Sequence, residues 1–237
     1  MHILVIDGHH VEAEFREKFG SAHRYTFFGS GPHNPTFSLD EFIAHGNSLI
    51  SAANAVFDFR EGSSSLLSRP TAITGVPVFE EATLESVDYA GFTNAIVYGF
   101  CGLPTLLNRP LLEISLANEA DRAKLAETCA ALGTDYRVVA DRVGLVTPRI
   151  ICQIINEACF TVQEGTATMQ DVDLSMKLGT SYPRGPFAWA NAIGVERVYA
   201  VLEALWHDTH DERYKVCPLL KRQALRGEPF NHGLPGF

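Results

Sequence analysis

Two places in the sequence hold residue types that could carry out chemistry: a polar turn near the start of the chain and a cysteine near its middle. The turn contains Asp7, His9 and His10, directly after a short apolar run. Adjacent histidines rarely direct both rings at one ion, so this spacing does not predict a metal site. Asp7 suits the cap of a helix that follows the turn. We therefore expect a structural turn here, with no bound metal.

The cysteine is Cys101, in the stretch Gly99–Pro104. A reactive thiol needs a nearby base and an electropositive setting. No histidine lies close to Cys101 in the sequence, so His207 or His210 would have to reach it through the fold. The alternative is a buried, unreactive thiol. Cys152 and Cys159 are seven residues apart in a helical pattern, which is typical of core packing.

The composition excludes several classes of partner. The chain has 237 residues, 46% hydrophobic and 20% charged, which is ample for a globular core. Its net charge of -9 and the lack of a basic run argue against nucleic-acid binding. No apolar stretch approaches the roughly 20 residues that span a bilayer. An odd number of cysteines without a C-x-x-C pair predicts neither a disulfide framework nor a zinc site. We expect a protein of the reducing cytoplasm.

The first half of the chain alternates between strand and helix patterns. Short apolar or β-branched runs predict strands, and the first of them should be buried in a parallel sheet. Helices are expected at 10–18, 39–44 and 121–132, and a loop at 29–35. Strands alternating with helices indicate an α/β domain with a mostly parallel sheet. The predicted strands cover 2–6, 24–28, 55–59, 70–75, 95–98 and 111–116.

After about residue 142 the pattern becomes entirely helical. Apolar residues recur at helical spacing from Ile150 to Val162, with Thr147 as the expected N-cap and Pro148 as the first helical residue. A second helix should begin with a capping box of Thr168 and Asp171 and end at Gly179. One helix or a pair is expected over 186–207. The sequence thus predicts a Rossmann-like α/β domain at 1–142 and an all-α domain at 143–237.

The helical part resembles the C-terminal domain of the 3-hydroxyacyl-CoA dehydrogenase family. The resemblance rests on several phrases in order along about 75 residues, the most specific being Gly179-Thr-Ser-Tyr-Pro-Arg-Gly-Pro-Phe187. The main role of these Gly and Pro residues is to form a rigid turn between helices. The other phrases begin at Gly144, Asn156, Glu164, Asp171, Ile193, Asp211 and Pro218, with a tail at 233–237.

The resemblance implies NAD as coenzyme, bound at a Gly-x-Gly-x-x-Gly turn after the first strand. In this sequence Gly8 lies in that turn, but Asp7, His9 and Glu12 stand at the three glycine positions. A carboxylate about 4 Å from a phosphate charge costs up to about 4 kcal/mol at an effective dielectric of 20. The ribose-binding acid is also missing, since Phe27-Phe28-Gly29-Ser30 stands in its place. NAD binding is therefore doubtful on the sequence.

The family's catalytic pair is a His followed twelve residues later by a Glu. Glu113 matches the Glu, and Cys101 stands where the His is expected. A thiol is a poor general base, and loss of a positioned base typically costs about 100- to 10,000-fold in rate. Pro148 replaces a polar Asn, although the neighbouring Arg149 is kept. The family's Asn-Thr-Ser phrase falls near Val76–Glu81, where no hydroxyl is present.

Three functions remain open at this point. The first is a dehydrogenase-like protein with lost or weakened activity and a cleft for an acyl-CoA-type ligand. The second is an active NAD-dependent 3-hydroxyacyl-CoA dehydrogenase with an altered site. The third is a structural or interaction protein. By resemblance the helical domain forms a homodimer, and the apolar face from Val198 to Trp206 is compatible with either a dimer interface or packing within the monomer.

Overall fold

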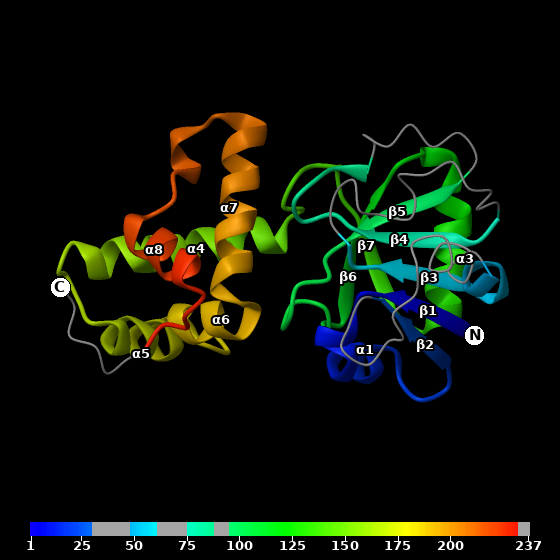
Figure 1. The fold of residues 1–237 in the computed structure, drawn as a ribbon, viewed down its shortest axis with the longest axis horizontal. Helices are drawn as coiled ribbons and strands as arrows, with labels where there is room; N and C mark the ends of the chain where they lie inside the picture. Colours follow the sequence, from blue (N-terminus) through cyan, green and yellow to red (C-terminus); the bar gives the residue numbers. More distant parts are fainter. Residues whose placement is uncertain (30–47, 61–74, 88–94, 232–237) are drawn as a thin grey trace. The chain divides into compact units, whose positions relative to one another are not determined.

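The structure is a computed structural model of the whole chain, described here for residues 1–29, 48–60, 75–87 and 95–231. It divides into two compact units (Figure 1). The α/β unit comprises Met1–Gly102 with Leu106–Leu145, and the helical unit comprises Leu103–Thr105 with Val146–Phe237. The expected α/β fold followed by an all-α region is confirmed.

A seven-stranded sheet forms the centre of the α/β unit, in the order β2-β1-β3-β4-β5-β6-β7. All neighbouring pairs are parallel except β5 and β6, which are antiparallel. The expected mostly parallel sheet is therefore confirmed. The strands are β1 (His2–Ile6), β2 (Arg24–Phe28), β3 (Ala55–Asp58), β4 (Pro77–Glu81), β5 (Ile96–Phe100), β6 (Leu111–Leu116) and β7 (Asp135–Val138).

The first strand is buried on both faces, as its continuous apolar run predicts. Ile3, Leu4, Val5 and Ile6 are all 0% exposed, and β1 pairs in parallel with both β2 and β3. The alternating side chains of β1 reach opposite faces of the sheet. A fully apolar strand can therefore lie only in the interior of such a sheet.

Two helices cover one face of this sheet. Phe15 and Phe19 of α1 (Glu12–Phe19) and Leu125 and Cys129 of α3 (Arg122–Leu132) join a single buried cluster with the sheet side chains. Aromatic rings fill its centre, with the Phe57 and Phe79 rings stacked at 4.5 Å. Burial of each large apolar side chain contributes about 1.5–3 kcal/mol. The 3-10 turns η1 (His9–Val11) and η5 (Glu119–Asp121) precede the two helices.

The helical unit contains five helices and a 3-10 turn within the described residues. They are α4 (Thr147–Gln163), α5 (Met169–Thr180), α6 (Pro186–Ile193), α7 (Val195–Thr209), η6 (Glu212–Tyr214) and α8 (Pro218–Arg226). The α5 capping box of Thr168 and Asp171 is confirmed. The sequence predicted one helix or a pair over 186–207, and the structure has a pair, since Gly194 separates α6 from α7.

Buried polar side chains fasten these helices together. The Asp173 carboxylate of α5 accepts hydrogen bonds from the N–H groups of Phe187 (2.8 Å) and Ala188 (3.0 Å), which satisfies the start of α6. Gly185 is needed there, because a Cβ atom would lie 2.5 Å from the Cα of Asp173. The Asn156 amide of α4 similarly binds the N–H of Cys217 at 2.8 Å. Asp173, Gly185 and Asn156 all lie in phrases that carry the family resemblance, and these contacts show that each of them holds helices together.

Some local predictions were wrong. The N-cap of α4 is Val146 rather than Thr147. Ser181, with φ 58°, ends α5, so Gly179 lies inside the helix. Ile150 is 53% exposed, although its spacing placed it in the core. Helix ends depend on cap geometry that the apolar period does not encode.

Two strands were missed or displaced. β4 begins at Pro77, whereas a strand was expected at 70–75, where only Gly75 is described. β7 lies at the sheet edge and was missed because it is short: its four residues alternate between exposed Asp135 and Arg137 and partly buried Tyr136 and Val138. The expected helix at 39–44 lies outside the described residues, as does the expected loop at 29–35 except for Gly29.

Candidate active site

The sheet reverses its strand order at β1. From β1 the chain adds β2 on one side, and β3 then pairs on the other side. In open parallel sheets, ligands bind at such a switch point, beside the carboxyl ends of the strands. Asp7 and Gly8 follow β1 here, and Phe59 and Arg60 follow β3. These residues are therefore where a dinucleotide would be expected.

Asp7 keeps the backbone shape of a tight turn without being glycine. Its φ is 53°, in the left-handed region that costs a non-glycine residue about 1–2 kcal/mol. The Asp7 N–H donates to the Phe28 carbonyl at 2.8 Å. The Asp7 side chain lies against Gly29, where a Cβ atom would stand 2.0 Å from Asp7 Oδ1. Asp7 is thus fixed between the ends of β1 and β2, and it is not the helix cap expected from the sequence, since Gly8 and Val11 precede η1 and α1.

Side chains of the sheet cover the backbone of Gly8. A Cβ atom on Gly8 would lie 2.5 Å from Val5 Cγ1 and 2.8 Å from both Phe59 Cδ2 and Phe59 Cε2. Phe59 is only 7% exposed, and its ring also meets the edge of the Phe100 ring at 5.2 Å. Gly8 is therefore a packing glycine, whose missing side chain admits the Phe59 ring.

An arginine balances the acidic charge at this turn. Arg60 donates from Nε and Nη2 to the two carboxylate oxygens of Asp58, at 2.9 and 2.7 Å. Arg60 Nε also lies 4.0 Å from Asp7 Oδ2. Asp58 is 1% exposed, so its charge needs such a partner. The repulsion that the sequence predicted between Asp7 and an anion is consequently offset in part by Arg60, which sequence reasoning missed.

The other residues of the turn make local contacts. The His9 ring lies 5.8 Å from the Phe27 ring, and the His10 ring lies edge-on to Phe59 at 5.7 Å. Glu12 accepts a hydrogen bond from Arg16 Nε at 2.8 Å. Within residues 1–29, 48–60, 75–87 and 95–231, no three His, Cys, Asp or Glu side chains gather in a way that could hold a metal ion.

The residues of this turn do not fit a dinucleotide diphosphate as a glycine-rich turn does. The second glycine of such a turn lets the backbone approach the pyrophosphate, and the third lets the helix pack closely on the strand. Here His9 and Glu12 stand at those places, and Phe59 covers Gly8. The described end of β2 also has no acid for a ribose, because Phe27, Phe28 and Gly29 occupy it.

Cys101 directly follows β5, and Glu113 lies on β6, the antiparallel neighbour of β5. The register pairs Tyr98 with Leu116 and ends with Phe100 opposite Ile114, so Cys101 and Glu113 are the next residues beyond the last pair. Residues directly opposite in an antiparallel pair extend to the same face of the sheet. The twelve-residue spacing of the pair therefore corresponds to a cross-strand position at the carboxyl end of β5. Cys101 is 7% exposed.

A buried carboxylate holds the turn that carries Cys101. Glu81 at the end of β4 is 8% exposed, and its two oxygens accept the N–H groups of Thr83 at 2.9 Å and Gly102 at 2.5 Å. A Cβ atom on Gly102 would lie 2.4 Å from Glu81 Oε2 and 2.6 Å from Phe59 Cε1. Glu81 thus ties the end of β4 to the residue after Cys101. Its position as the last residue of a buried strand was the signal that could have identified it.

Thr83 brings a hydroxyl to the same edge. The ladder between β4 and β5 continues through a hydrogen bond from the Ala82 N–H to the Phe100 carbonyl at 2.9 Å. Thr83 follows, 0% exposed, and its Oγ1 has no hydrogen-bond partner among the described residues. An unsatisfied buried hydroxyl is costly and calls for an explanation. The family's Asn-Thr-Ser phrase was expected near Val76–Glu81, and Thr83 lies two residues beyond that stretch.

Pro148 and Arg149, which the resemblance matches to a polar Asn and an Arg of the family, have structural roles in the helical unit. Pro148 is buried in the first turn of α4. The Arg149 Nη1 donates to the Tyr214 hydroxyl at 2.5 Å, and Tyr214 is 3% exposed. Arg149 therefore fastens α4 to η6. His207 and His210 also belong to this unit, where both rings contact Trp206.

The remaining cysteines are core residues. Burial raises the pKa of Cys129 and of Cys152 to about 12, and raises the pKa of Cys159 and Cys217 as well. Cys152 and Cys159 are both 0% exposed, which confirms that their helical spacing reflects packing. A protonated thiol is a poor nucleophile, so these four residues do not suit catalysis.

Residues 144–233 match the family model described as 3-hydroxyacyl-CoA dehydrogenase, C-terminal domain. A 3-hydroxyadipyl-CoA dehydrogenase of Escherichia coli is 44% identical over 87 residues, which are 37% of this chain and 18% of that protein. A probable 3-hydroxybutyryl-CoA dehydrogenase of Bacillus subtilis is 38% identical over 144 residues, covering 53% of this chain and 50% of that protein. The chain spans half or less of the length of these relatives.

Solved structures resemble almost the whole chain. FadB2 of Mycobacterium tuberculosis has a TM-score of 0.73 at 17% identity, over 99% of this chain and 97% of its own. The (S)-3-hydroxybutyryl-CoA dehydrogenase of Ralstonia eutropha has a TM-score of 0.67 at 18% identity, over 95% of this chain and 94% of its own. At these identities the likeness establishes the fold alone.

Proposed function

Because this chain is a divergent relative of the 3-hydroxyacyl-CoA dehydrogenase family, matching best in its helical domain, we propose that it is a dehydrogenase-like protein with lost or weakened dehydrogenase activity. Its ligand is an acyl-CoA-type molecule, the class that the names of its relatives contain. NAD is the coenzyme that the resemblance implies, and we propose that this chain binds it weakly or not at all.

The packing of Phe59 on Gly8 carries the proposal. In a working dinucleotide turn the backbone after the first strand meets the diphosphate. In this chain the ring of Phe59 covers that backbone, with 2.8 Å between its Cδ2 and a Cβ built on Gly8. Admitting a coenzyme in the usual pose would require Phe59 to leave the aromatic cluster. That displacement costs about as much as the burial of a large apolar side chain, roughly 1.5–3 kcal/mol.

The Cys101 and Glu113 pair supports the same conclusion. An unperturbed thiol has a pKa near 8.5 and replaces an imidazole poorly as a general base. Glu113 lacks the imidazole that it would orient in the family's reaction. We therefore propose that the pair is what remains of a catalytic site.

Exposed leucines on α5 support the proposed homodimer. Leu174 is 54% exposed and Leu178 is 75% exposed, one helical turn apart. The stripe of Val198, Val201 and Leu202, by contrast, is 0% exposed within the helical unit. A dimer interface would therefore use α5 rather than the apolar face of α7, for which the sequence left both a dimer interface and packing within the monomer open.

The test is an assay with NADH and acetoacetyl-CoA, followed at the nicotinamide absorbance band. We expect no steady oxidation above the background of protein-free buffer. Steady oxidation that disappears in a Glu113→Gln variant would overturn the proposal in favour of an active enzyme. Thermal unfolding with NAD and with CoA in separate samples distinguishes an inactive ligand-binding protein from a structural or interaction protein, because a ligand of the native state raises Tm. We expect a rise with CoA and none with NAD.

A further inference from the structure

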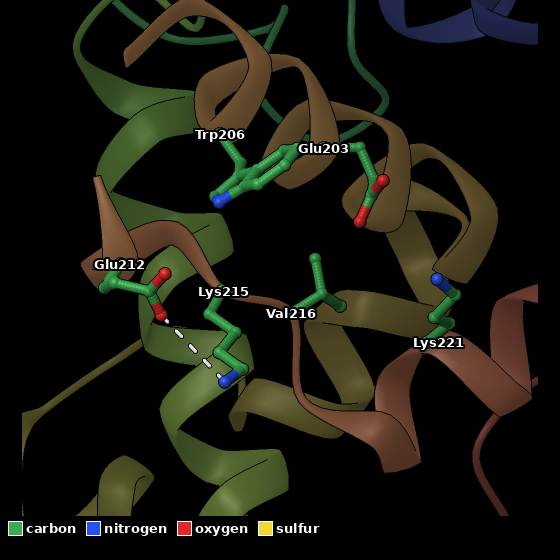
Figure 2. Close-up of a pocket in the computed structure, with 6 residues that line it drawn as sticks. All are labelled: Glu203, Trp206, Glu212, Lys215, Val216 and Lys221. Atoms are coloured by element: carbon green, nitrogen blue, oxygen red, sulfur yellow. Dashed lines mark ion pairs between the residues drawn. The ribbon is translucent and has the colours of Figure 1, made fainter. Parts of the chain in front are cut away.

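The helical unit has a cavity of about 350 Å³ that the proposed function does not use. It lies between α7 and the segment from η6 to the start of α8, and its volume suits a small-molecule ligand. Figure 2 shows Val216 pointing toward Trp206, with charged side chains on both sides. Six residues line it: Glu203, Trp206, Glu212, Lys215, Val216 and Lys221.

Neighbouring rings hold the indole of Trp206 in place. The His210 ring stacks on it at 5.2 Å with an interplanar angle of 1°. The His207 ring meets it at 5.0 Å and 71°. His210 is itself fixed at the end of α7, where its backbone N–H donates to the Trp206 carbonyl at 2.7 Å. The cavity therefore has a preorganised aromatic wall, which suits a planar ring at a low entropic cost.

The segment beside the cavity is basic in an acidic chain. Residues 213–226 contain no Asp or Glu, and the chain has a net charge of -9. Arg213 pairs with Asp211 at 3.1 Å, and the lining holds two glutamates and two lysines, so the positive charge available to a ligand comes from Lys215 and Lys221. The segment's basic residues are five of the 19 Lys and Arg: Arg213, Lys215, Lys221, Arg222 and Arg226.

Both lysines of the cavity can reach a ligand. Lys215 Nζ is 3.9 Å from Glu212 Oε2, and the two side chains are 73% and 83% exposed, so their pairing is weak and easily exchanged. Lys221 itself lines the cavity, and its Nζ lies 5.8 Å from the centre of the Tyr199 ring, a weak contact that leaves the ammonium able to bind a ligand. Lysine serves proteins as a phosphate ligand through its point charge.

We propose that this cavity binds a nucleoside phosphate. The base packs between Trp206 and Val216, and Lys215 and Lys221 contact the phosphate groups. Glu203, on the opposite side from Lys215 in Figure 2, accepts hydrogen bonds from ribose hydroxyls. The source of the nucleotide is either a free nucleotide such as ADP or the 3′-phospho-ADP part of coenzyme A, and the experiment separates the two.

Isothermal titration calorimetry of the full chain tests the proposal, with ADP, 3′,5′-ADP, adenosine and inorganic phosphate as separate titrants. We expect saturable binding of ADP or 3′,5′-ADP and at least about tenfold weaker binding of adenosine and of phosphate. Tighter binding of 3′,5′-ADP indicates coenzyme A as the source, and tighter binding of ADP indicates a free nucleotide. If phosphate or adenosine bound as tightly as either nucleotide, the proposal that the cavity contacts both the base and the phosphate groups would be overturned.

Variants of exposed residues locate the site. A Lys215→Gln/Lys221→Gln double variant should weaken nucleotide binding at least about tenfold. Trp206→Leu should weaken it to a similar degree while phosphate binding stays unchanged. Lys124→Gln, on α3 of the other unit, is the matched control and should bind as the unmodified chain does. Unchanged nucleotide binding in the double variant, with an unchanged circular dichroism spectrum, would overturn the proposal, as would no saturable binding of any nucleotide.

Discussion

The phenyl ring of Phe59 lies against the backbone of Gly8, with its Cδ2 and Cε2 atoms each 2.8 Å from where a Cβ of Gly8 would stand. The contact joins the turn after β1 to the residue after β3. The same ring approaches Gly102, whose Cβ would lie 2.6 Å from Phe59 Cε1. One aromatic side chain therefore links the turn of the expected coenzyme site to the turn that carries Cys101.

Gly8→Ala should destabilise the protein by about 1–3 kcal/mol, because the added methyl meets Val5 and Phe59. The backbone of Gly8 (φ -94°, ψ 17°) suits alanine, so the cost is steric. The measurement is the free energy of unfolding in urea. Gly179→Ala is the control: nothing lies within 4 Å of its added Cβ inside α5, and it should stabilise by up to about 1 kcal/mol. A neutral Gly8→Ala would show that Phe59 moves aside readily.

Cys101→His tests whether dehydrogenase activity is limited by the cysteine at the catalytic His position or by the altered coenzyme turn. The substitution restores an imidazole opposite Glu113, where a positioned base is worth about 100- to 10,000-fold in rate. We expect the NADH-linked rate with acetoacetyl-CoA to stay within about tenfold of background, because we propose that the turn binds the coenzyme weakly or not at all. The control is Cys129→His, which places the ring in the core, away from Glu113. A gain of about a hundredfold or more would mean that NAD binds despite Phe59.

Much of the α/β architecture could be predicted, because burial on both faces leaves a clear signal. Ile3 to Ile6 gives an uninterrupted apolar run, and β1 has the predicted bounds. The capping box of Thr168 and Asp171 is equally local, so its side chains could be identified from their spacing. These predictions needed only neighbours in the sequence.

The site could be predicted only in part, since its decisive contacts join distant segments. The pair of Cys101 and Glu113 was predicted from the family resemblance, and both residues come next beyond the last pair of the β5–β6 register. Phe59 and Arg60 follow β3, and no local pattern shows that they reach a turn some fifty residues earlier. Glu81 looked like an ordinary charged residue, yet its oxygens bind the N–H groups of Thr83 and Gly102.

Glu81→Ala should destabilise the α/β unit by about 2–5 kcal/mol, because it leaves the buried N–H groups of Thr83 and Gly102 without their acceptor. Urea unfolding followed by far-ultraviolet circular dichroism measures the loss. Glu127→Ala is the matched control, since its side chain is 70% exposed in a surface pair with Lys124 and should change stability little. Equal effects of the two substitutions would show that the hydrogen bonds of Glu81 are not important for stability.

The buried thiols predict a loss of stability in alkali. Burial raises the pKa of Cys129 and Cys152 to about 12 from an ordinary value of 9.0. Between these values the unfolded chain has released protons that the native state retains, so the free energy of unfolding falls as pH rises from 9 toward 12. The slope is at most about 1.4 kcal/mol per pH unit for each thiol. Below pH 9 the contribution is fully present.

Urea unfolding at a series of pH values checks this slope. Cys152→Ala should be less stable at pH 8 but should lose stability less steeply above pH 9, because one titrating thiol has been removed. The same slope in both proteins would contradict the assignment of alkaline sensitivity to buried cysteines.

Thr83→Val should stabilise the protein, by about 1 kcal/mol, in contrast to most substitutions of buried residues. The change keeps the branched shape and removes a hydroxyl that has no partner among the described residues.

A buried group that costs stability is often retained for function. We therefore expect the same substitution to weaken binding of an acyl-CoA-type ligand, measured by calorimetry with acetoacetyl-CoA, because a thioester carbonyl could accept this hydroxyl. Ser115→Ala is the contrasting control, since that hydroxyl already donates to Asp141 at 2.8 Å and its removal should destabilise. A less stable Thr83→Val protein would mean that the hydroxyl already has a partner, and unchanged ligand affinity would remove Thr83 from the candidate site.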